Sequence, residues 1–513
     1  MRKIGIVITT LVFALILISC GPRTSVKGYF LDIDERTTSI IFSIELEDPN
    51  DEITGNVIVE LIDVKTNAIV NSKTLYQENE YSNINFTGLD NKGDYKIDVR
   101  VTIGRESKVV VSHDVDLQSL ETKVITSVED FMDMASNPEG NYELGQSIDF
   151  SNVSFLSPFG SVSKTFSGTF DGKGYTLSNI TFGSITGNVG LFGYVSSGTI
   201  KNLNINNVKI GSPDARLTTQ TASKIGVLAG YVSSSDAVIE NISIDQAEIY
   251  VTSSSSYQIH VGGIFGDLRA VAKNIEQRNV MVDVLTTSYA KVNVGGVAGF
   301  VGEQGGLRQV LSYADIYQEV IGDYVDISTK AWNINVGGVV GDFNSRLSRG
   351  LQDVIHTGNI KVDLDFGTPS GQKGTYDVYI GGLTGRSYGQ IYQAMYEGSI
   401  ALNHTENEFE SSIIKSFYVG GISGYYESNF IIDHVVYFNN TRSIDLNVSE
   451  DSKVYLSYTV GAIPITLNHE FGYTGEGTLT KNGSAFVEVK PSPIIDSLEG
   501  YFTSEFMTSP KNE

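Results

Sequence analysis

The side chains best suited to chemistry in this chain are aspartates on predicted strands. Asp363 and Asp365 lie two residues apart in "GNIKVDLDF", so a strand places both on one face. Asp283 and Asp445 would lie near them on adjacent coils of a repeat. Carboxylates gathered on one face can coordinate Ca²⁺ or serve as the acid and base of glycoside hydrolysis. The alternative is the solvated outer face of an acidic protein, with no Arg or Lys beside the aspartates on the same strand to hold an anionic sugar.

The histidines predict no metal site. They are dispersed, without an HExxH motif or a pair spaced i, i+4, at His113, His260, His356, His404, His434 and His469. The turn "FDGKG" at 170–174 lacks the further ligands of an EF-hand and the lysine of a phosphate loop. We find no catalytic constellation, so we expect no cofactor and leave only a Ca²⁺ site open.

Tyrosines are the remaining candidates for ligand binding. Tyr257, Tyr289, Tyr376 and Tyr418 each precede a copy of a recurring glycine-rich hexamer. If the copies stack, a ladder of tyrosines along one flank could stack on sugar rings or contact a protein partner. The alternative is that these side chains only cover the edges of the strands.

The hexamer itself predicts the architecture that must position these side chains. It reads VGGIFG from Val261, VGGVAG from Val294, VGGVVG from Val336, IGGLTG from Ile380 and VGGISG from Val419, with looser copies from Ile225 and Val189. Its closing glycines are 33 to 44 residues apart, and alternating strand patterns lie on both sides of each copy. Such spacing is typical of a solenoid, and the period-2 patterns favour strands over helices. The sequence therefore predicts a right-handed parallel β-helix, a pectin-lyase-like solenoid with one coil per repeat.

Each hexamer is expected to form a corner between two sheet faces. The fourth residue is always aliphatic and the fifth varies, so we predict that the fourth points into the core and the fifth outward. Glycine suits a corner because it tolerates a positive φ and because coils about 4.8 Å apart leave little room for a Cβ atom. We assign this structural role to Gly190, Gly193, Gly226, Gly230, Gly262, Gly263, Gly266, Gly295, Gly296, Gly299, Gly337, Gly338, Gly341, Gly381, Gly382, Gly385, Gly420, Gly421 and Gly424.

Two further elements precede the repeat. About seven short alternating strands over 26–118 predict a β-sandwich. Within it, "TGLDNKGDYKIDVRV" resembles the fibronectin type III pattern, in which Leu89 and Tyr95 would brace a corner. Residues 127–136 predict a short capping helix over one end of the β-helix, because Ser127 can cap it and an apolar stripe includes Phe131 and Ala135.

The N-terminus resembles that of an exported lipoprotein. Arg2 and Lys3 precede an apolar run at 4–18, which as a helix would span about 22 Å and fall short of a bilayer core of about 30 Å. The run ends in "LISC", similar to the lipobox of bacterial lipoproteins, which implies that cleavage leaves Cys20 as a lipid-bearing N-terminus on the membrane. The alternative is a plain secretory signal.

Composition limits the partners of the exported chain. The formal net charge is −24, and removal of Arg2 and Lys3 with the signal makes it −26. Nucleic-acid binding depends on clustered Lys and Arg, so no nucleic-acid partner is expected. Cys20 is the only cysteine, so the chain has no internal disulfide and its stability must come from packing.

The first coils resemble a known family. "NYELGQSIDFSN", "FSGTFDGKGYTLSNITF" and "VGLFGYVSSGTIKNLNI" are similar to the GLUG-motif β-helix of bacterial surface proteins and adhesins. The matching positions are Gly168, Phe170, Asp171, Gly172, Gly174, Asn179 and Gly190–Gly193. This resemblance covers roughly 122–465 and implies a fold rather than an activity, because the motif consists of turn and core residues.

These observations lead to one domain assignment and three functional hypotheses. We expect a signal peptide at 1–19, a lipidated cysteine and linker at 20–25, the sandwich at 26–118, the β-helix at 119–465, and a C-terminal cap and tail at 466–513. The favoured hypothesis is a lipid-anchored surface protein with a non-catalytic role in binding glycans or proteins. A polysaccharide lyase or glycoside hydrolase, and a purely architectural surface protein, are the alternatives.

Overall fold

The computed structural model describes residues 25–448 except 36–38, 91–92, 116, 118–121, 184–186, 220, 255–256, 288–290, 322–331, 366–374, 406–413, 427–431 and 439–442, and then separate strands between 453 and 495. The chain divides into two compact units, Met1–Ser119 and Leu120–Glu513. Both consist almost entirely of strands, as predicted. Within the described ranges, no helix is long and apolar enough to cross a membrane. The predicted signal peptide and Cys20 lie outside these ranges.

The first unit contains two antiparallel sheets that share one core. Their strand orders are β1-β2-β5 and β4-β3-β6-β7. The elements are β1 (Lys27–Glu35), β2 (Ser39–Glu47), β3 (Val57–Asp63), β4 (Ala68–Leu75), a 3₁₀ helix (Glu78–Tyr81), β5 (Ile84–Thr87), β6 (Tyr95–Ile103) and β7 (Glu106–Val115). Phe42 from one sheet and Val59 from the other are at most 1% exposed and belong to the same apolar cluster. The unit is therefore a β-sandwich.

A tyrosine braces one corner of this sandwich. Leu89 and Tyr95 are both buried. The Tyr95 hydroxyl accepts a hydrogen bond from the backbone N–H of Asp90 at 3.0 Å. The two residues thus occupy the bracing positions expected from the sequence, whereas the fibronectin type III resemblance stays a prediction.

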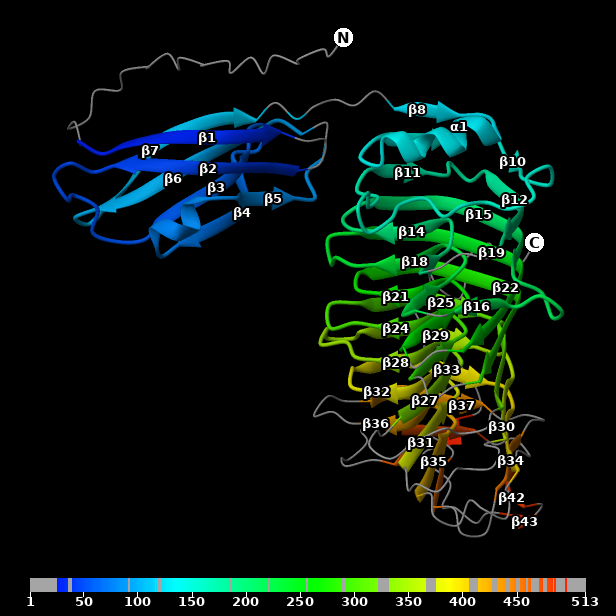
Figure 1. Ribbon diagram of the computed structural model, residues 1–513. Coiled ribbons are helices and arrows are strands. Elements are labelled where there is room, and N and C mark those ends of the chain that lie inside the picture. Colours follow the sequence, from blue (N-terminus) through cyan, green and yellow to red (C-terminus); the bar gives the residue numbers. More distant parts are fainter. Residues whose placement is uncertain are drawn as a thin grey trace. The chain divides into compact units, whose positions relative to one another are not determined.

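The second unit is a parallel β-helix whose coils stack along one axis (Figure 1). In each coil the chain runs through a first sheet, a glycine corner, a second sheet and a long third sheet. The first sheet contains β13 (Asn188–Val189), β17 (Ser223–Ile225), β20 (Ile259–Gly262), β23 (Val292–Gly295), β27 (Trp332–Gly337), β31 (Thr375–Gly381), β35 (Ile414–Gly420) and β39 (Lys453–Ser457). The second contains β14 (Phe192–Val195), β18 (Ala229–Val232), β21 (Phe265–Leu268), β24 (Ala298–Val301), β28 (Val340–Phe343), β32 (Thr384–Ser387), β36 (Ser423–Tyr426) and β40 (Val460–Ala462).

The third sheet contains the most strands, and its first strands lie at the end of the β-helix that the helix covers. It contains β8 (Lys123–Ile125), β9 (Asn141–Leu144), β10 (Ile148–Asp149), β11 (Thr169–Asp171), β12 (Thr176–Phe182), β15 (Thr199–Ile210), β16 (Leu217–Thr219), β19 (Val238–Ser253), β22 (Val271–Thr286), β25 (Gly306–Ser312), β26 (Asp315–Ile321), β29 (Leu351–His356), β30 (Ile360–Asp365), β33 (Ile391–Glu397), β34 (Ile400–Thr405), β37 (Ile432–Phe438), β38 (Ser443–Asn447), β41 (Glu470–Tyr473), β42 (Thr478–Lys481), β43 (Ser484–Ala485) and β44 (Ile494–Ile495). Inward aliphatic side chains from all three sheets form one continuous core.

A short helix covers the first coil, as the sequence predicts. It comprises α1 (Val128–Asp133) and a 3₁₀ turn (Met134–Ser136). The Ser127 hydroxyl accepts from the backbone N–H of Asp130 at 3.1 Å. Phe131 is buried, and its ring packs edge-to-face against the ring of Phe170, with the two ring centroids 6.0 Å apart. Ala135, expected in the apolar stripe, is exposed because the 3₁₀ turn rotates it away from the core.

The hexamer glycines line up in columns along the axis. Gly262, Gly295, Gly337, Gly381 and Gly420 occupy one register position on successive strands of the first sheet. A Cβ atom on the following glycine, at Gly263, Gly296, Gly338 and Gly382, would lie 2.0–2.1 Å from a carbonyl oxygen of the next coil. Crowding therefore favours glycine in these four coils. The second reason expected from the sequence, a positive φ, does not hold, because among these glycines only Gly190 has one, and its 158° is close to extended backbone.

The fifth hexamer residue points inward, contrary to the sequence-based expectation. All six copies have an exposed fraction of 0%: Ala229, Phe265, Ala298, Val340, Thr384 and Ser423. The second sheet folds back so closely on the first that a Cβ atom on Gly266 would lie 2.4 Å from the backbone nitrogen of Ile225. The variation at the fifth position therefore reflects packing tolerance inside the corner rather than exposure to solvent.

The long third-sheet strands contain a second kind of bend. Asn202, Asn241 and Asn274 share one register position and have φ values of 53°, 57° and 56°. Asn241 donates to the Asn202 side-chain oxygen at 2.8 Å, and Asn274 donates to that of Asn241 at 2.6 Å. Asparagine tolerates this left-handed conformation better than most residues. The resulting asparagine ladder bends each strand without interrupting its pairing.

Candidate functional site

The outward side chains of the third sheet, beyond the asparagine ladder, gather most of the sequence-predicted aspartates. This outer face comprises Glu248 and Tyr250 on β19, Met281 and Asp283 on β22, Asp315, Tyr317 and Glu319 on β26, Lys361 and Asp363 on β30, and Asn403 on β34. Parallel pairing in register places these residues in columns, with strands about 4.8 Å apart.

Asp283 is held by an arginine that sequence analysis did not associate with it. Both guanidinium NH groups of Arg216 donate to the Asp283 carboxylate at 2.9 Å. Arg216 also lies over the Tyr250 ring, 5.5 Å from its centroid. It comes from the loop that precedes β16 (Leu217–Thr219), so this surface loop is tied down on the outer face.

Asp363 is surrounded by donors, including a lysine on its own strand. Lys361 Nζ lies 2.6 Å from one carboxylate oxygen, which also accepts from the Tyr317 hydroxyl at 2.8 Å. Asn403 donates to the other oxygen at 2.8 Å. Burial alone would raise the pKa of Asp363, but these three hydrogen bonds outweigh it and lower the pKa. The expectation that no Arg or Lys assists these aspartates on the same strand is therefore wrong.

The other two predicted aspartates lie at other positions of the third sheet. Asp365 is the last residue of β30 and is exposed. Asp445 lies on β38, in the same register column as Asp283 but four strands further along the stack. Sequence reasoning thus identified the correct face but not the residues that contact one another.

A glutamate between the two paired aspartates was missed. Glu319 belongs to β26, whose neighbours are the strands of Asp283 and Asp363. Burial raises the pKa of Glu319, Arg216 opposes that shift, and the two aspartates add to it. The alternation of "DIYQEVI" places Glu319 and Tyr317 on one face, and this pattern is the signal that could have identified it.

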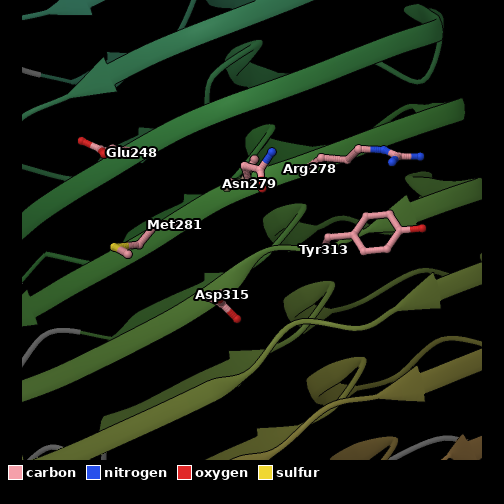
Figure 2. Close-up of a pocket in the computed structure, with 7 residues that line it drawn as sticks. Glu248, Arg278, Asn279, Met281, Tyr313 and Asp315 are labelled. Atoms are coloured by element: carbon pink, nitrogen blue, oxygen red, sulfur yellow. The ribbon is translucent and has the colours of Figure 1, made fainter. Parts of the chain in front are cut away.

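An open pocket adjoins this network on the same face (Figure 2). Its volume is about 440 Å³, and its lining residues are Glu248, Arg278, Asn279, Val280, Met281, Tyr313 and Asp315. Tyr313 and Met281 expose 39% and 41% of their surface. The side chains of Arg278 on β22 and of Tyr313, between β25 and β26, lie side by side, with the guanidinium carbon 5.3 Å from the ring centroid. An apolar floor with charged groups around it can hold a small polar ligand.

The pocket results from a one-residue offset between two coils. On β22 four residue steps separate Gln277 from Met281, whereas on the next coil three steps separate their partners Ser312 and Asp315. The continuous strand therefore gives way to two strands, β25 and β26, with Tyr313 in the break. Because side chains cannot stay in column across this break, a hollow opens between the coils.

The charges in the pocket are oriented by neighbours. Arg278 Nε donates to the carboxylate of Glu276 at 2.8 Å, and this hydrogen bond is the main reason that its pKa is raised. One oxygen of Asp315 accepts from the backbone N–H of Asn359 at 2.8 Å and from its side chain at 3.1 Å. Both groups are thus held in fixed positions.

The histidines are structural where the structure describes them. His113 pairs with Glu35 at 2.7 Å in the sandwich. His260 and His356 are buried in the β-helix, and burial lowers their pKa values to about 4 and about 3. His404 is also buried, whereas His434 has no described side chain and His469 lies outside the described residues. Among the side chains that the structure describes, no three His, Cys, Asp or Glu residues are grouped to hold a metal ion.

The predicted tyrosines separate into different environments. Tyr257 is 56% exposed. Tyr418 stacks between Tyr379 and Tyr455, with ring centroids 4.9 and 4.7 Å apart. Tyr289 and the side chain of Tyr376 lie outside what is described. Neither Tyr257 nor Tyr418 lines the pocket, whose exposed tyrosine is Tyr313.

The residues of the "FDGKG" motif form a turn. Phe170 is buried, and Asp171 accepts from the backbone N–H of Lys173 at 2.9 Å and from Asn202 at 3.0 Å. Gly174 has a φ of 79°, which glycine adopts readily. The motif therefore starts the asparagine ladder.

Comparison with known proteins gives one partial match. A family model described as "M26 IgA1-specific Metallo-endopeptidase N-terminal region" matches residues 107–246. The matched stretch runs from β7 into β19 and ends before every residue of the pocket. No curated protein and no solved structure matches the chain. This part of the chain is thus similar to the N-terminal region of a family of IgA1-specific metallo-endopeptidases.

Proposed function

We propose that this chain is a lipid-anchored bacterial surface protein whose β-helix binds a glycan without altering it. The supporting observation is the pocket on the outer face. In this pocket the exposed ring of Tyr313 and the thioether of Met281 can pack against the apolar face of a sugar. The side chains of Glu248, Arg278 and Asp315 can form hydrogen bonds with its hydroxyl groups.

The neighbouring aspartates favour binding over catalysis. Hydrolysis needs one carboxyl group free to give a proton and another free to attack or activate water. Asp283 is engaged by Arg216, and Asp363 by Lys361, Tyr317 and Asn403. The zinc-peptidase motif HExxH does not occur in the sequence, and the matched family region is described as an N-terminal region.

Export and anchoring are supported by the N-terminal residues and by the family similarity. The apolar run at 4–18 ending at Cys20 fits a lipoprotein signal. The matched family is described as IgA1-specific, so IgA1 is the protein ligand to test beside glycans. The GLUG-type and adhesin-like assignments belong to the same proposal.

A binding experiment on the chain from Gly21 onward tests this function. We expect the wild type to bind members of a glycan array, and Tyr313→Ala to lose about tenfold in affinity, a loss of about 1.4 kcal/mol. Tyr175→Ala is the matched control, since Tyr175 is also 39% exposed on the β-helix but is absent from the pocket. Release of reducing or unsaturated sugars would contradict the non-catalytic proposal, and binding to IgA1 alone would replace the glycan with a protein ligand.

A further inference from the structure

The charge distribution around the pocket limits which sugars it can accept. We propose that the pocket is selective for uncharged or amine-bearing sugar residues and excludes uronic and sialic acids. This inference rests on the proposed glycan-binding function and defines the ligand class of the same site.

Two carboxylates flank the pocket floor. Glu248, Met281 and Asp315 occupy one register column on three consecutive strands, so a carboxylate lies on each side of the Met281 thioether. With strands about 4.8 Å apart, any group resting on Met281 is within a few ångströms of both. Figure 2 shows Glu248 and Asp315 on opposite sides of Met281.

The pocket's own cation is already neutralised. Arg278 donates to Glu276, whose side chain is 5% exposed, at 2.8 Å. Its partner on the neighbouring strand is Asp245, a second carboxylate. A ligand carboxylate would therefore meet a guanidinium whose charge these two carboxylates already offset.

The surroundings do not reverse this balance. Lys209 is the cross-strand partner of Glu248 and adds a second cation, whereas Arg216 and Lys361 in the adjoining network are paired with Asp283 and Asp363. The four carboxylates of Asp245, Glu248, Glu276 and Asp315 therefore outnumber the cations of Lys209 and Arg278. Hydroxyl and ammonium groups of a sugar can donate to the exposed carboxylates, whereas a sugar carboxylate is repelled by them.

The size and floor of the pocket fit a sugar residue. Its volume of about 440 Å³ is at the lower end of the range for ligand pockets, roughly 300–1,000 Å³. Val280 is buried beneath, and the exposed Met281 and Tyr313 provide apolar contact for the C–H face of one or two sugar rings.

An array with matched substituents tests the selectivity. Gluco-, galacto- and manno-configured oligosaccharides are each printed in neutral, amine-bearing and uronic acid forms, beside sialylated glycans and lysine-rich peptides. At constant ionic strength we expect neutral or amine forms of at least one configuration to bind at least tenfold better than the acid form. That signal must fall in Tyr313→Ala, which leaves the charge unchanged and so separates pocket binding from non-specific attraction to an acidic protein.

Charge reversal sharpens the test. Glu248→Lys should reduce the discrimination against acid forms by about tenfold. Asp236→Lys is the matched control, because it makes the same charge change on an exposed turn that precedes the same strand, β19, at the end away from the pocket.

The outcomes separate the two proposals. If acid forms bind at equal or higher affinity and this binding depends on Tyr313, the proposed selectivity is wrong but the glycan-binding function stands. Equal effects of Glu248→Lys and Asp236→Lys would lead to the same conclusion. No Tyr313-dependent glycan signal would overturn the proposed function and the selectivity with it. Tyr313-dependent binding of lysine peptides alone would do the same and would assign the pocket to a protein ligand.

Discussion

The two bends of each coil solve the same geometric problem by opposite means. At the hexamer corner the side chain is removed, because a carbonyl oxygen of the next coil occupies the place of a Cβ atom. At the bend in the third sheet the side chain is essential, because Asn202, Asn241 and Asn274 bond to one another from coil to coil.

This difference explains why one bend is conspicuous in the sequence and the other is not. A steric requirement repeated from Gly263 to Gly382 favours glycine and produces a visible motif, although the preceding coil holds Val227 at the equivalent position. A requirement for a left-handed φ is met by several residues, and the equivalent position holds Gln309, Asp353 and Gln393 in later coils. The comparison predicts that adding a side chain at the glycine bend lowers the stability of the fold more than replacing an asparagine at the other bend does.

The largest effect is expected from filling the glycine corner. Gly263→Val should lower the free energy of unfolding by more than about 2 kcal/mol, through overpacking. A Cβ atom there would lie 2.1 Å from the Gly296 carbonyl oxygen and 2.7 Å from the Gln277 side chain. Thermal or denaturant unfolding of the two proteins measures the difference.

A control in the same corner isolates the cause. Ala298→Val adds apolar volume at the fifth hexamer position, where the next coil already holds Val340. We expect it to cost less than about 1.5 kcal/mol, as tolerated core changes do. Coincident unfolding curves for wild type and Gly263→Val would remove the crowding argument.

A smaller effect is expected at the asparagine bend. Asn241→Ala places a residue that disfavours positive φ at 57° and removes hydrogen bonds to both neighbouring coils, so it should cost about 1–2 kcal/mol. Asn241→Gly keeps the backbone conformation and loses only the hydrogen bonds. If both variants are equally destabilised in urea, backbone strain contributes nothing and the ladder acts through its amides alone.

The smallest effect concerns a polar ladder on the outer side of the glycine corner. Asn335 donates to Asn293 at 2.8 Å, and Asn293 donates to His260 Nδ1 at 2.9 Å, which requires a neutral imidazole. Burial lowers the pKa of His260 to about 4, while Asp267 opposes the shift and Lys224 adds to it.

Because the pKa of His260 is lower in the folded state, the unfolded state gains a proton first as pH falls below about 6.5. Stability should therefore decrease by about 1 kcal/mol between pH 7 and 5.5 from this residue. Burial raises the pKa of Asp342 to about 6, so this residue makes stability increase as pH falls. The measurement therefore compares the wild type with His260→Asn, because Asp342 contributes equally to both. Equal pH dependence of wild type and His260→Asn would show that folding leaves the pKa of His260 unchanged, which would contradict the prediction.

Much of the fold was predictable because it depends on repeated local patterns. The hexamers and period-2 strands indicated a β-helix, and the cap at Ser127 indicated the helix that covers it. The bends at Asn202 and Asn241 were hidden because the strand alternation continues on both sides of them. The inward direction of Phe265 was missed because the corner is tighter than a simple change of face.

The candidate site was less predictable because it depends on contacts between distant residues. Arg216 and Asp283 are 67 residues apart, and no local pattern joins them. The pocket depends on one missing residue between β25 and β26, which is visible only after the coils are aligned. Sequence analysis therefore found the face through Asp283 and Asp363 but could not find Tyr313.

The offset at the pocket determines where a recess can form. Five residue steps separate Gln277 from Val282, but only four separate Ser312 from Ile316, His356 from Ile360 and Tyr396 from Ile400, so the shorter spacing continues in the next two coils. The pocket therefore marks the junction between coils of two lengths, and one residue added beside Tyr313 would shift this junction by one coil instead of closing the recess. On such a scaffold the place of a recess is set by where the coil length changes.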